Sequence, residues 1–421
     1  MLKSKGDDGD ISMPYLRAAH VQPGGLHLHD VKEMWFSPDE AAQLSLLSGD
    51  VVVVEGGAGY GRSAYIPSTL DGWGFQNSIN RVRPRAGFIG RFLDFAIKSA
   101  MSSGQLDNLV NQATIPHLTA EKLAVVPVPH ASLTEQQSIT DYLDHETAAI
   151  DALISDQQEA LELLSSRWKS ELVNCVQTGV DKETHTTDDD TWPRAPQGWR
   201  QTRLKVTTTS VRNGAWGAEP EADETTVRCI RVADFDKIHG SVHDQNITTR
   251  SYPATVMAES ALHPGDLIIE KSGGGPTTPV GNVVRYDGAG GEMYSNFVAR
   301  IEIASGVDSS YALRLHQALY TSGVTTRSIK QTTGIQNLDA TSYFAEPIFL
   351  PPLAEQQRIA EHLAARRNDI DELSADLTRA IALAKERRSA LITAAVTGQI
   401  DVTAKHRPAA EQLEDDIKEL T

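Results

Sequence analysis

Two groups of polar side chains in this 421-residue chain have the residue types that bind nucleic acid. In the first half, Arg81 and Arg83 alternate with other residues, so on a strand they would share one face. Arginine and lysine grip phosphates or read guanine, whereas asparagine and glutamine read adenine. The candidate DNA contacts in this half are Arg62, Gln76, Asn77, Arg81 and Arg83.

A comparable group occurs in the second half of the chain, around a glycine-rich turn and just before a long helical stretch. Its candidate DNA contacts are Lys271, Ser272, Asn296, Arg327, Lys330, Gln331, Thr333 and Gln336. A solvated strand face would explain any one of these residues without a ligand. Because such clusters occur in both halves, the pair of clusters favours a binding surface over scattered surface polarity.

No set of residues in the sequence has the spacing of a known catalytic or metal site. The glycine run at 57–61 follows a valine-rich segment but lacks the spacing of a dinucleotide-binding loop, so it predicts a glycine turn between strands. His27 and His29 have no cysteine partner and no helical spacing, so we expect an exposed strand or loop. Zinc-protease, nucleophile-elbow, phosphate-loop and methyltransferase motifs are absent from the sequence. We therefore expect a chain that is not itself an enzyme and binds no metal.

The elements that must position these residues occur twice. The heptapeptide Leu-Thr-Glu-Gln-Gln-Ser-Ile at 133–139 returns as Leu-Ala-Glu-Gln-Gln-Arg-Ile at 353–359. The β-type segments upstream of each heptapeptide also correspond, with insertions and deletions between them. A repeat of this length exceeds a solenoid unit of about 20–50 residues. It indicates a duplicated domain that does one kind of job at two places.

Two long helices follow from the same repeat. The stretch 134–178 contains no glycine or proline, and its apolar residues recur at spacings of three, four and seven. Thr134 is the predicted N-cap, and Gly179 and Gly398 are the predicted stops of the first and second helix. Because the helices repeat each other, we expect them to pair as an antiparallel coiled coil around a pseudo-twofold axis.

The predicted fold is therefore α+β, with two β-rich domains separated and braced by two long helices. The predicted segments are a first β-rich domain (1–132), a central helix (133–180), a polar linker (181–195), a second β-rich domain (196–352), a C-terminal helix (353–402) and a charged tail (403–421). The second domain opens with Pro-Gln-Gly-Trp at 196–199, which has no counterpart in the first. We expect the first domain to lack the corresponding initial strand.

Charge, cysteine content and hydropathy indicate the class of protein and its cellular location. The net charge of −17 argues against nucleic acid, but the acidic excess lies mainly in residues 133–190, and the β-rich blocks are nearly neutral. Cys175 falls in a helical pattern, where a buried apolar role is expected, and two unlike cysteines predict no disulfide framework. The sequence contains neither an apolar run of membrane-spanning length nor a secretory signal, so we expect a cytoplasmic protein without a membrane partner.

Together these features resemble the specificity subunit of type I restriction–modification systems. The resemblance lies in the segment 351–360 with its partner at 133–139, in Ala-Ala-Val-Thr-Gly at 394–398, and in the opening at 196–199. It implies that each β-rich block is a target-recognition domain that reads one half of a bipartite double-stranded DNA site. It also implies that the paired helices set the distance between the two halves.

The resemblance implies partners as well. Two methyltransferase subunits that use S-adenosylmethionine would dock on the helices, and restriction subunits that use ATP and Mg²⁺ would join through them. The chain itself would carry no cofactor. Two alternatives remain open: a protein–protein scaffold without a DNA role, which the −17 charge supports, and a degenerate specificity subunit that reads one half-site. The DNA-reading part of a fused restriction enzyme is disfavoured, because no catalytic motif accompanies it.

Overall fold

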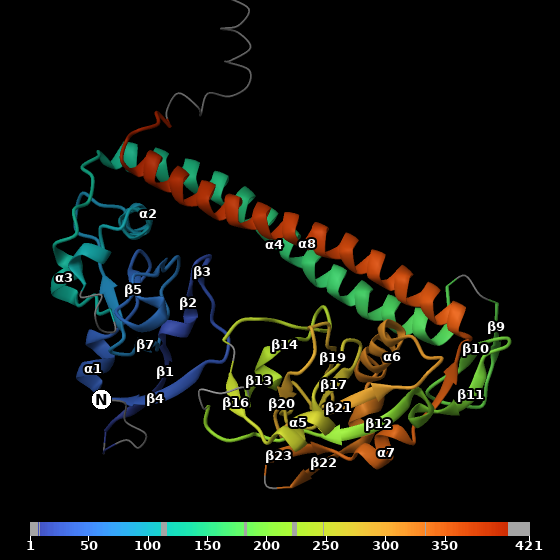
Figure 1. Ribbon diagram of the computed structural model, residues 1–421. Helices are drawn as coiled ribbons and strands as arrows, with labels where there is room; N and C mark the ends of the chain where they lie inside the picture. Colours follow the sequence, from blue (N-terminus) through green and yellow to red (C-terminus); the bar gives the residue numbers. More distant parts are fainter. Residues whose placement is uncertain are drawn as a thin grey trace, which may run out of the picture. The chain divides into compact units, whose positions relative to one another are not determined.

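The computed structural model describes residues 7 and 9–402 except 111–115, 181–182, 221–224, 247 and 333. Thr333 and the predicted tail 403–421 therefore lie outside the described residues. The chain divides into two compact units, which we call unit 1 (Met1–Glu159 with Leu377–Thr421) and unit 2 (Ala160–Asp376). Each unit combines a β-rich region with part of two long helices, α4 (Leu133–Thr178) and α8 (Leu353–Val396) (Figure 1).

The long helices begin and end close to the residues that the sequence predicts. Helix α4 starts in a capping box in which Ser132 N donates to Glu135 Oε2 at 2.7 Å and Glu135 N donates to Ser132 Oγ at 3.3 Å. The N-cap is thus Ser132, and the prediction of Thr134 was wrong by two residues. Gly179 and Gly398 have the left-handed φ values of 74° and 73° that are typical of a residue just beyond a helix.

The two helices pack against each other with opposite chain directions. In unit 2, Leu172 near the end of α4 shares a core with Leu363 near the start of α8. In unit 1, Leu143 near the start of α4 shares a core with Ile392 near the end of α8. The Arg388 guanidinium also donates to Asp151 across the pair at 2.8 Å. The antiparallel helix pair predicted from the sequence is therefore confirmed.

Unit 1 contains two small three-stranded sheets. One has the order β4 (Lys32–Phe36), β1 (Ile11–Leu16), β7 (Gly74–Phe75), and the other has the order β6 (Ser63–Tyr65), β5 (Val51–Val54), β8 (Ile79–Val82). A hairpin of β2 (Val21–Gln22) and β3 (Gly25–Leu26) and the helices α1 (Pro38–Gln43), α2 (Gly90–Ser102) and α3 (Ala120–Ala124) complete it. All four valines of β5 are buried, because alternate side chains enter cores on opposite faces of the sheet.

Unit 2 repeats this plan and enlarges it. Its sheets have the orders β12 (Thr208–Asn213), β21 (Val298–Ile303), β17 (Leu267–Glu270), β19 (Val283–Arg285); then β16 (Thr249–Ser251), β13 (Thr226–Ile230), β20 (Met293–Tyr294); then β18 (Ser272–Gly273), β23 (Ile335–Leu338), β22 (Ile329–Thr332). Three further pairs are β11 (Arg200–Arg203) with β24 (Pro347–Leu350), β10 (Arg194–Pro196) with β9 (Thr184–Thr186), and β14 (Phe235–Asp236) with β15 (Ser241–Val242). Its short helices are α5 (Ala254–Ser260), α6 (Ser309–Thr321) and α7 (Ala340–Phe344).

The two units differ at one side of the repeated sheet. In unit 2, β12 pairs with β21, and β11 pairs with β24. Among the described residues of unit 1, no strand pairs with the outer edge of β8, the counterpart of β21. The segment 125–130 corresponds to 345–350, which contains β24, and it likewise lies outside any strand. No helix in the described part of the chain is long and apolar enough to cross a membrane.

Candidate nucleic-acid interface

Two arginines predicted to contact DNA, Arg81 and Arg83, are engaged within unit 1. Arg81 Nη1 donates to the backbone oxygens of Gln43 at 2.8 Å and Ser45 at 2.6 Å. The Arg83 guanidinium donates to both carboxylate oxygens of the buried Asp50, each at 2.7 Å. The two side chains do point the same way, as expected from their alternation. Arg81 and Arg83 each make at least two hydrogen bonds to the framework of unit 1, so neither belongs to the proposed interface.

Unit 2 repeats this arrangement with a different arginine. Arg300 lies at the position of β21 that matches Arg81 in β8, and its Nη1 donates to Ala261 O at 2.9 Å. Its Nε lies 2.7 Å from the carboxylate of Asp266, and both side chains are buried. The pair was missed from the sequence, although the Gly-Asp dipeptides at 49–50 and 265–266 mark it. The repeated arginine belongs to the framework of the duplicated block.

The structure brings most of the predicted unit 2 residues together. Strand β18 pairs with β23, which places Ser272 opposite Asn337 and Gly273 opposite Gln336. Strand β22 pairs with the other side of β23. The backbone N–H groups of Lys271 and Ser272 donate to Phe297 O at 2.8 and 3.1 Å, which ties in the Asn296 turn. We call the resulting group the unit 2 loop cluster; it comprises Lys271, Ser272, Asn296, Lys330, Gln331 and Gln336.

Members of the unit 2 loop cluster differ in what their side chains can do. Asn296, Lys330 and Gln331 are exposed, and Lys271 is half-buried. Lys330 Nζ lies 2.6 Å from Asp339, and this lysine contact, followed by hydrogen bonds from Ser342, lowers the pKa of Asp339 to about 2. The exposed amides and amines are the donors and acceptors that a base edge or a phosphate requires.

Two other members support the cluster from within. Gln336 is buried, and its Oε1 accepts from Val280 N at 3.2 Å. Ser272 Oγ donates to Asn337 Oδ1 at 2.6 Å. These contacts hold the glycine turn against the β22–β23 hairpin. Gln336 and Ser272 therefore have positioning roles in this structure.

Arg327 is directed away from the cluster. Its Nη1 donates to Thr191 Oγ1 at 2.7 Å and lies 3.8 Å from the carboxylate of Glu346. The remaining prediction of this half, Thr333, falls outside the described residues.

Unit 1 contains a corresponding turn with different chemistry. Glu55 N donates to Ser78 O at 2.8 Å, as Lys271 N does to Phe297 O. This contact places the predicted Gln76–Asn77 pair beside the glycine turn; Gln76 is half-buried and Asn77 is exposed. Where unit 2 has Lys271, unit 1 has Glu55, whose carboxylate lies 3.8 Å from His117 Nδ1. The two turns therefore present unlike charges on the same backbone arrangement.

The last prediction for unit 1, Arg62, is exposed and lies elsewhere on the unit. It lines a small cavity together with Lys98 of α2 and Arg388 of α8. His27 and His29 follow β3, with ring centroids 6.3 Å apart. Within the described residues they join no group of three possible metal ligands, and His29 is exposed. Their predicted place in an exposed strand or loop fits this position.

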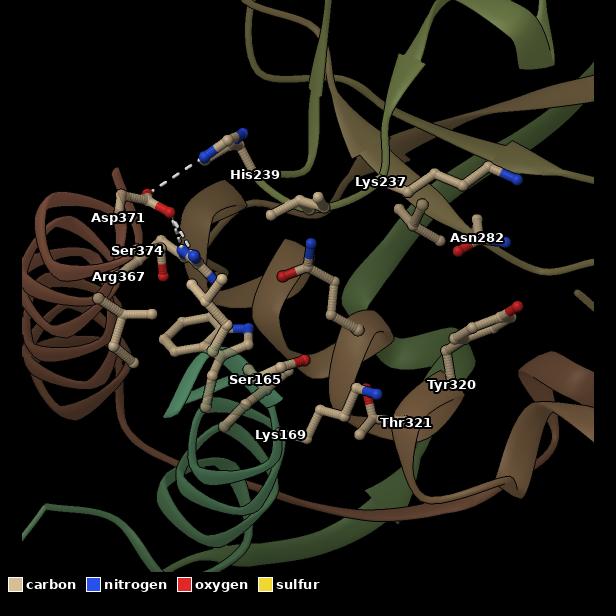
Figure 2. Close-up of a pocket in the computed structure, with 17 residues that line it drawn as sticks. Ser165, Lys169, Lys237, His239, Asn282, Tyr320, Thr321, Arg367, Asp371 and Ser374 are labelled. Atoms are coloured by element: carbon tan, nitrogen blue, oxygen red, sulfur yellow. Dashed lines mark hydrogen bonds and ion pairs between the residues drawn. The ribbon is translucent and has the colours of Figure 1, made fainter. Parts of the chain in front are cut away.

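A larger cavity of about 450 Å³ lies in unit 2 where both long helices meet the β-rich region (Figure 2). Lys169 of α4, Lys237 and Arg367 of α8 contribute cationic side chains to its lining. Arg367 Nε donates to Asp371 Oδ1 at 2.9 Å, and His239 Nε2 lies 3.1 Å from the other oxygen of that carboxylate. The His239 contact joins α8 to the 237–239 segment, and the sequence contained no motif that indicated it.

Comparisons with known proteins support the fold. No protein-family model matches the chain, and no curated protein matches it. A solved chain from a study of complex assembly and conformational transition in the type I restriction–modification system superposes with a TM-score of 0.70, at 18% identity over 93% of both chains. Two further similar structures are the HsdS subunit of Thermoanaerobacter tengcongensis (TM-score 0.49, 19% identity, 93% of this chain and 92% of that one) and the type I S subunit of M. genitalium (0.34, 12%, 92% and 93%).

Proposed function

Because the chain has the fold of a type I restriction–modification specificity subunit, we propose that it selects DNA for such a complex. Each unit would read one half of a bipartite double-stranded site. The observation that carries this proposal is the similarity to a type I chain over 93% of both molecules, with a TM-score of 0.70. The internal repeat supports it independently, because it supplies two recognition blocks of one design.

The proposed contact surfaces, together called the loop clusters, are the unit 2 loop cluster and the corresponding unit 1 turn with Glu55, Gln76 and Asn77. In unit 2, Lys330 would grip a phosphate, and Gln331 or Asn296 would reach a base edge. In unit 1, Asn77 occupies the place of Asn296, and Glu55 replaces Lys271. Two clusters with unlike charges on one backbone plan would read unlike half-sites, as a bipartite asymmetric site requires.

We propose the remaining division of labour on the same basis. The helix pair would dock two methyltransferase subunits, which bring S-adenosylmethionine. Restriction subunits, which bring ATP and Mg²⁺, would associate through those methyltransferase subunits. This chain would contribute recognition and assembly, and the chemical steps would take place on its partners.

A salt-dependent binding assay tests the proposal. The full chain, with a methyltransferase partner, is titrated against DNA fragments by fluorescence anisotropy at several salt concentrations. We expect Lys330→Ala to weaken binding and to reduce the log–log salt slope by about 1. Gln331→Ala should cost about 1–3 kcal/mol on the unit 2 half-site only. Arg327→Ala removes the same charge from a side chain that is directed away from the unit 2 loop cluster, towards Thr191, so its effect should be smaller.

A second candidate function is a protein–protein scaffold with no DNA role. The net charge of −17 and the acidic α4 favour it, because DNA repels both. Binding that is absent at low salt even with the methyltransferase partner would establish the scaffold and refute the DNA reader. If Asn77→Ala leaves binding unchanged whereas Gln331→Ala abolishes one half-site, the chain reads only that half.

A further inference from the structure

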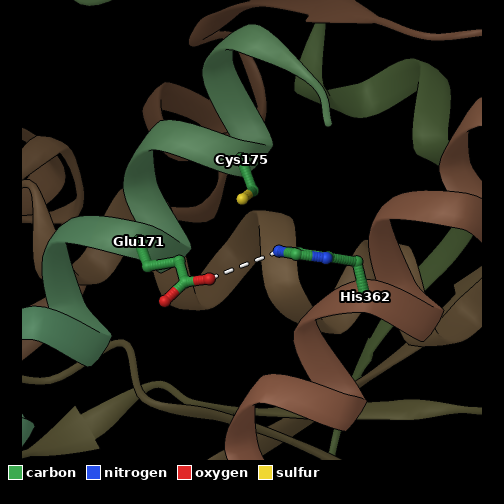
Figure 3. Close-up of side chains that lie close together, drawn as sticks. All are labelled: Glu171, Cys175 and His362. Carbon is green, nitrogen blue, oxygen red and sulfur yellow. Dashed lines mark hydrogen bonds and ion pairs between the residues drawn. The ribbon is translucent and has the colours of Figure 1, made fainter. Parts of the chain in front are cut away.

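Three side chains with the chemistry of transition-metal ligands converge where α4 and α8 meet in unit 2 (Figure 3). Glu171 and Cys175 lie four residues apart on α4, so one face of the helix presents both. His362 faces them from α8. One donor atom from each residue lies within 4.8 Å of the other two. In the described part of the chain, this is the one group of three or more such ligands.

The three donor types fit zinc, and so does the spacing of Glu171 and His362. Thiolate and imidazole donors favour zinc over Mg²⁺ or Ca²⁺, which prefer oxygen. Zinc–nitrogen and zinc–oxygen bonds of about 2.0–2.2 Å in a tetrahedron place those two ligand atoms about 3.3–3.5 Å apart. His362 Nε2 lies 3.3 Å from Glu171 Oε1. That separation is long for a charge-assisted hydrogen bond of about 2.7–2.9 Å, whereas it matches two atoms on one metal ion.

Glu171 is already paired with Arg366, and Arg366 also has a second carboxylate partner, Asp369. Arg366 Nε donates to Glu171 Oε1 at 3.0 Å, and its Nη1 donates to Asp369 at 3.1 Å. If zinc took Glu171, Arg366 could keep Asp369 as its counter-ion.

We propose that Glu171, Cys175 and His362 form a zinc site with a water molecule as the fourth ligand. Binding would join the last turns of α4 to the first turns of α8, at the end of the helix pair in unit 2. Zinc would replace the thiol proton of Cys175, which is released to solvent, so no oxidant or reductant is needed. The site is independent of DNA reading by the loop clusters.

Metal titration of the full chain is the direct test. The protein, stripped with chelator and kept reduced, is titrated with zinc, and bound metal is measured after gel filtration. We expect one zinc per chain. Loss of a residue that only supports a metal ligand costs up to about 100-fold in affinity, so Cys175→Ser, which removes a direct ligand, should lower the affinity by at least about 100-fold. Cys229→Ser is the matched control, because Cys229 is buried in the β-rich part of unit 2, and it should bind like the natural chain.

Two further measurements keep the test decisive if Cys175→Ser folds poorly. Cobalt(II) bound to the natural chain should show a thiolate-to-metal charge-transfer absorption, which a site without Cys175 cannot give. Arg366→Gln should raise zinc affinity by roughly tenfold, because it removes a competing cation whose Nε lies 3.0 Å from Glu171 Oε1, the proposed ligand atom. Absence of stoichiometric zinc, or cobalt binding without the thiolate band, would overturn the proposal. So would weaker zinc binding in a folded Arg366→Gln variant.

Discussion

Two arginines at matched positions of the repeat belong to the framework and not to the proposed interface. Arg81 ties β8 to the segment before β5 by donating to Ser45 O, and Arg300 ties β21 to the segment before β17 by donating to Ala261 O. The two acceptors occupy matched positions of the repeat. The sequence alone predicted Arg81 and Lys330 equally as DNA contacts. What separates them is the tertiary surroundings: Arg81 is half-buried against carbonyl oxygens, whereas Lys330 is 74% exposed.

At the same scale, buried His316 predicts a pH dependence of unit 2. It lies on α6, its Nδ1 is 2.7 Å from the Tyr343 hydroxyl, and burial lowers its pKa to about 4. In the unfolded chain the pKa is about 6.5, so the unfolded state binds a proton between pH 6.5 and pH 4 that the folded state does not. The unfolding free energy of unit 2 should therefore fall as pH drops through this window, by about 3 kcal/mol in all.

Position 97 of α2, the counterpart of His316 in unit 1, is an isoleucine and supplies the control substitution. His316→Ile should flatten the pH dependence, whatever it does to stability at pH 7. Hydrogen–deuterium exchange of α6 peptides in urea, at pH 7 and pH 4.5, measures the change. If the unfolding free energy of the variant fell with pH as steeply as that of the natural chain, other groups in unit 2 would govern the acid sensitivity of this unit.

Among the elements, the helices could be predicted and the sheets could not. Helices depend on local sequence pattern, so the absence of glycine and proline predicted the bounds of α4 and α8 to within a few residues. The Thr134 error arose because the Ser132–Glu135 capping box begins two residues earlier. Sheet pairing depends on residues far apart in sequence. The contact between β18 and β23, which builds the unit 2 loop cluster, spans more than 60 residues and has no local signal.

The free edge of β8 predicts a difference in local stability between the units. Strand β8 pairs on one side with β5, whereas β21 lies between β12 and β17. Amide hydrogens of Ile79–Val82 that point away from β5 have no strand partner among the described residues. They should exchange faster than those of Val298–Ile303, since local opening is easier at an edge. Exchange measured by mass spectrometry at pH 7 tests this, and equal protection of the two strands would contradict it.

For the whole molecule, a strongly acidic net charge is compatible with the proposed DNA reading. Charge acts locally, because interactions between exposed charges fade beyond a Debye length of about 8–10 Å. The acidic excess lies on α4 and the linker after it, whereas Lys330 and Gln331 belong to β22 of unit 2. Duplication keeps the helix sequence similar at 133–139 and 353–359 while the two β-rich blocks diverge. Selection for one frame with two different readers would produce this pattern.

The hypothesis that the helix pair sets the spacer between half-sites leads to a test on the full complex. Removing seven residues from α4 and seven facing residues from α8 keeps the helical register and shortens each helix by about 10 Å at 1.5 Å per residue. At about 3.4 Å per base pair, the spacer of the methylated site should shrink by about three base pairs, with both half-sites unchanged. Mapping the methylated bases in the genomes of cells that express each variant measures the spacer. Deleting a heptad from α4 alone should abolish methylation, because it breaks the pairing with α8. If the symmetric deletion changed the half-sites themselves, the helices would be shaping the readers and not their separation.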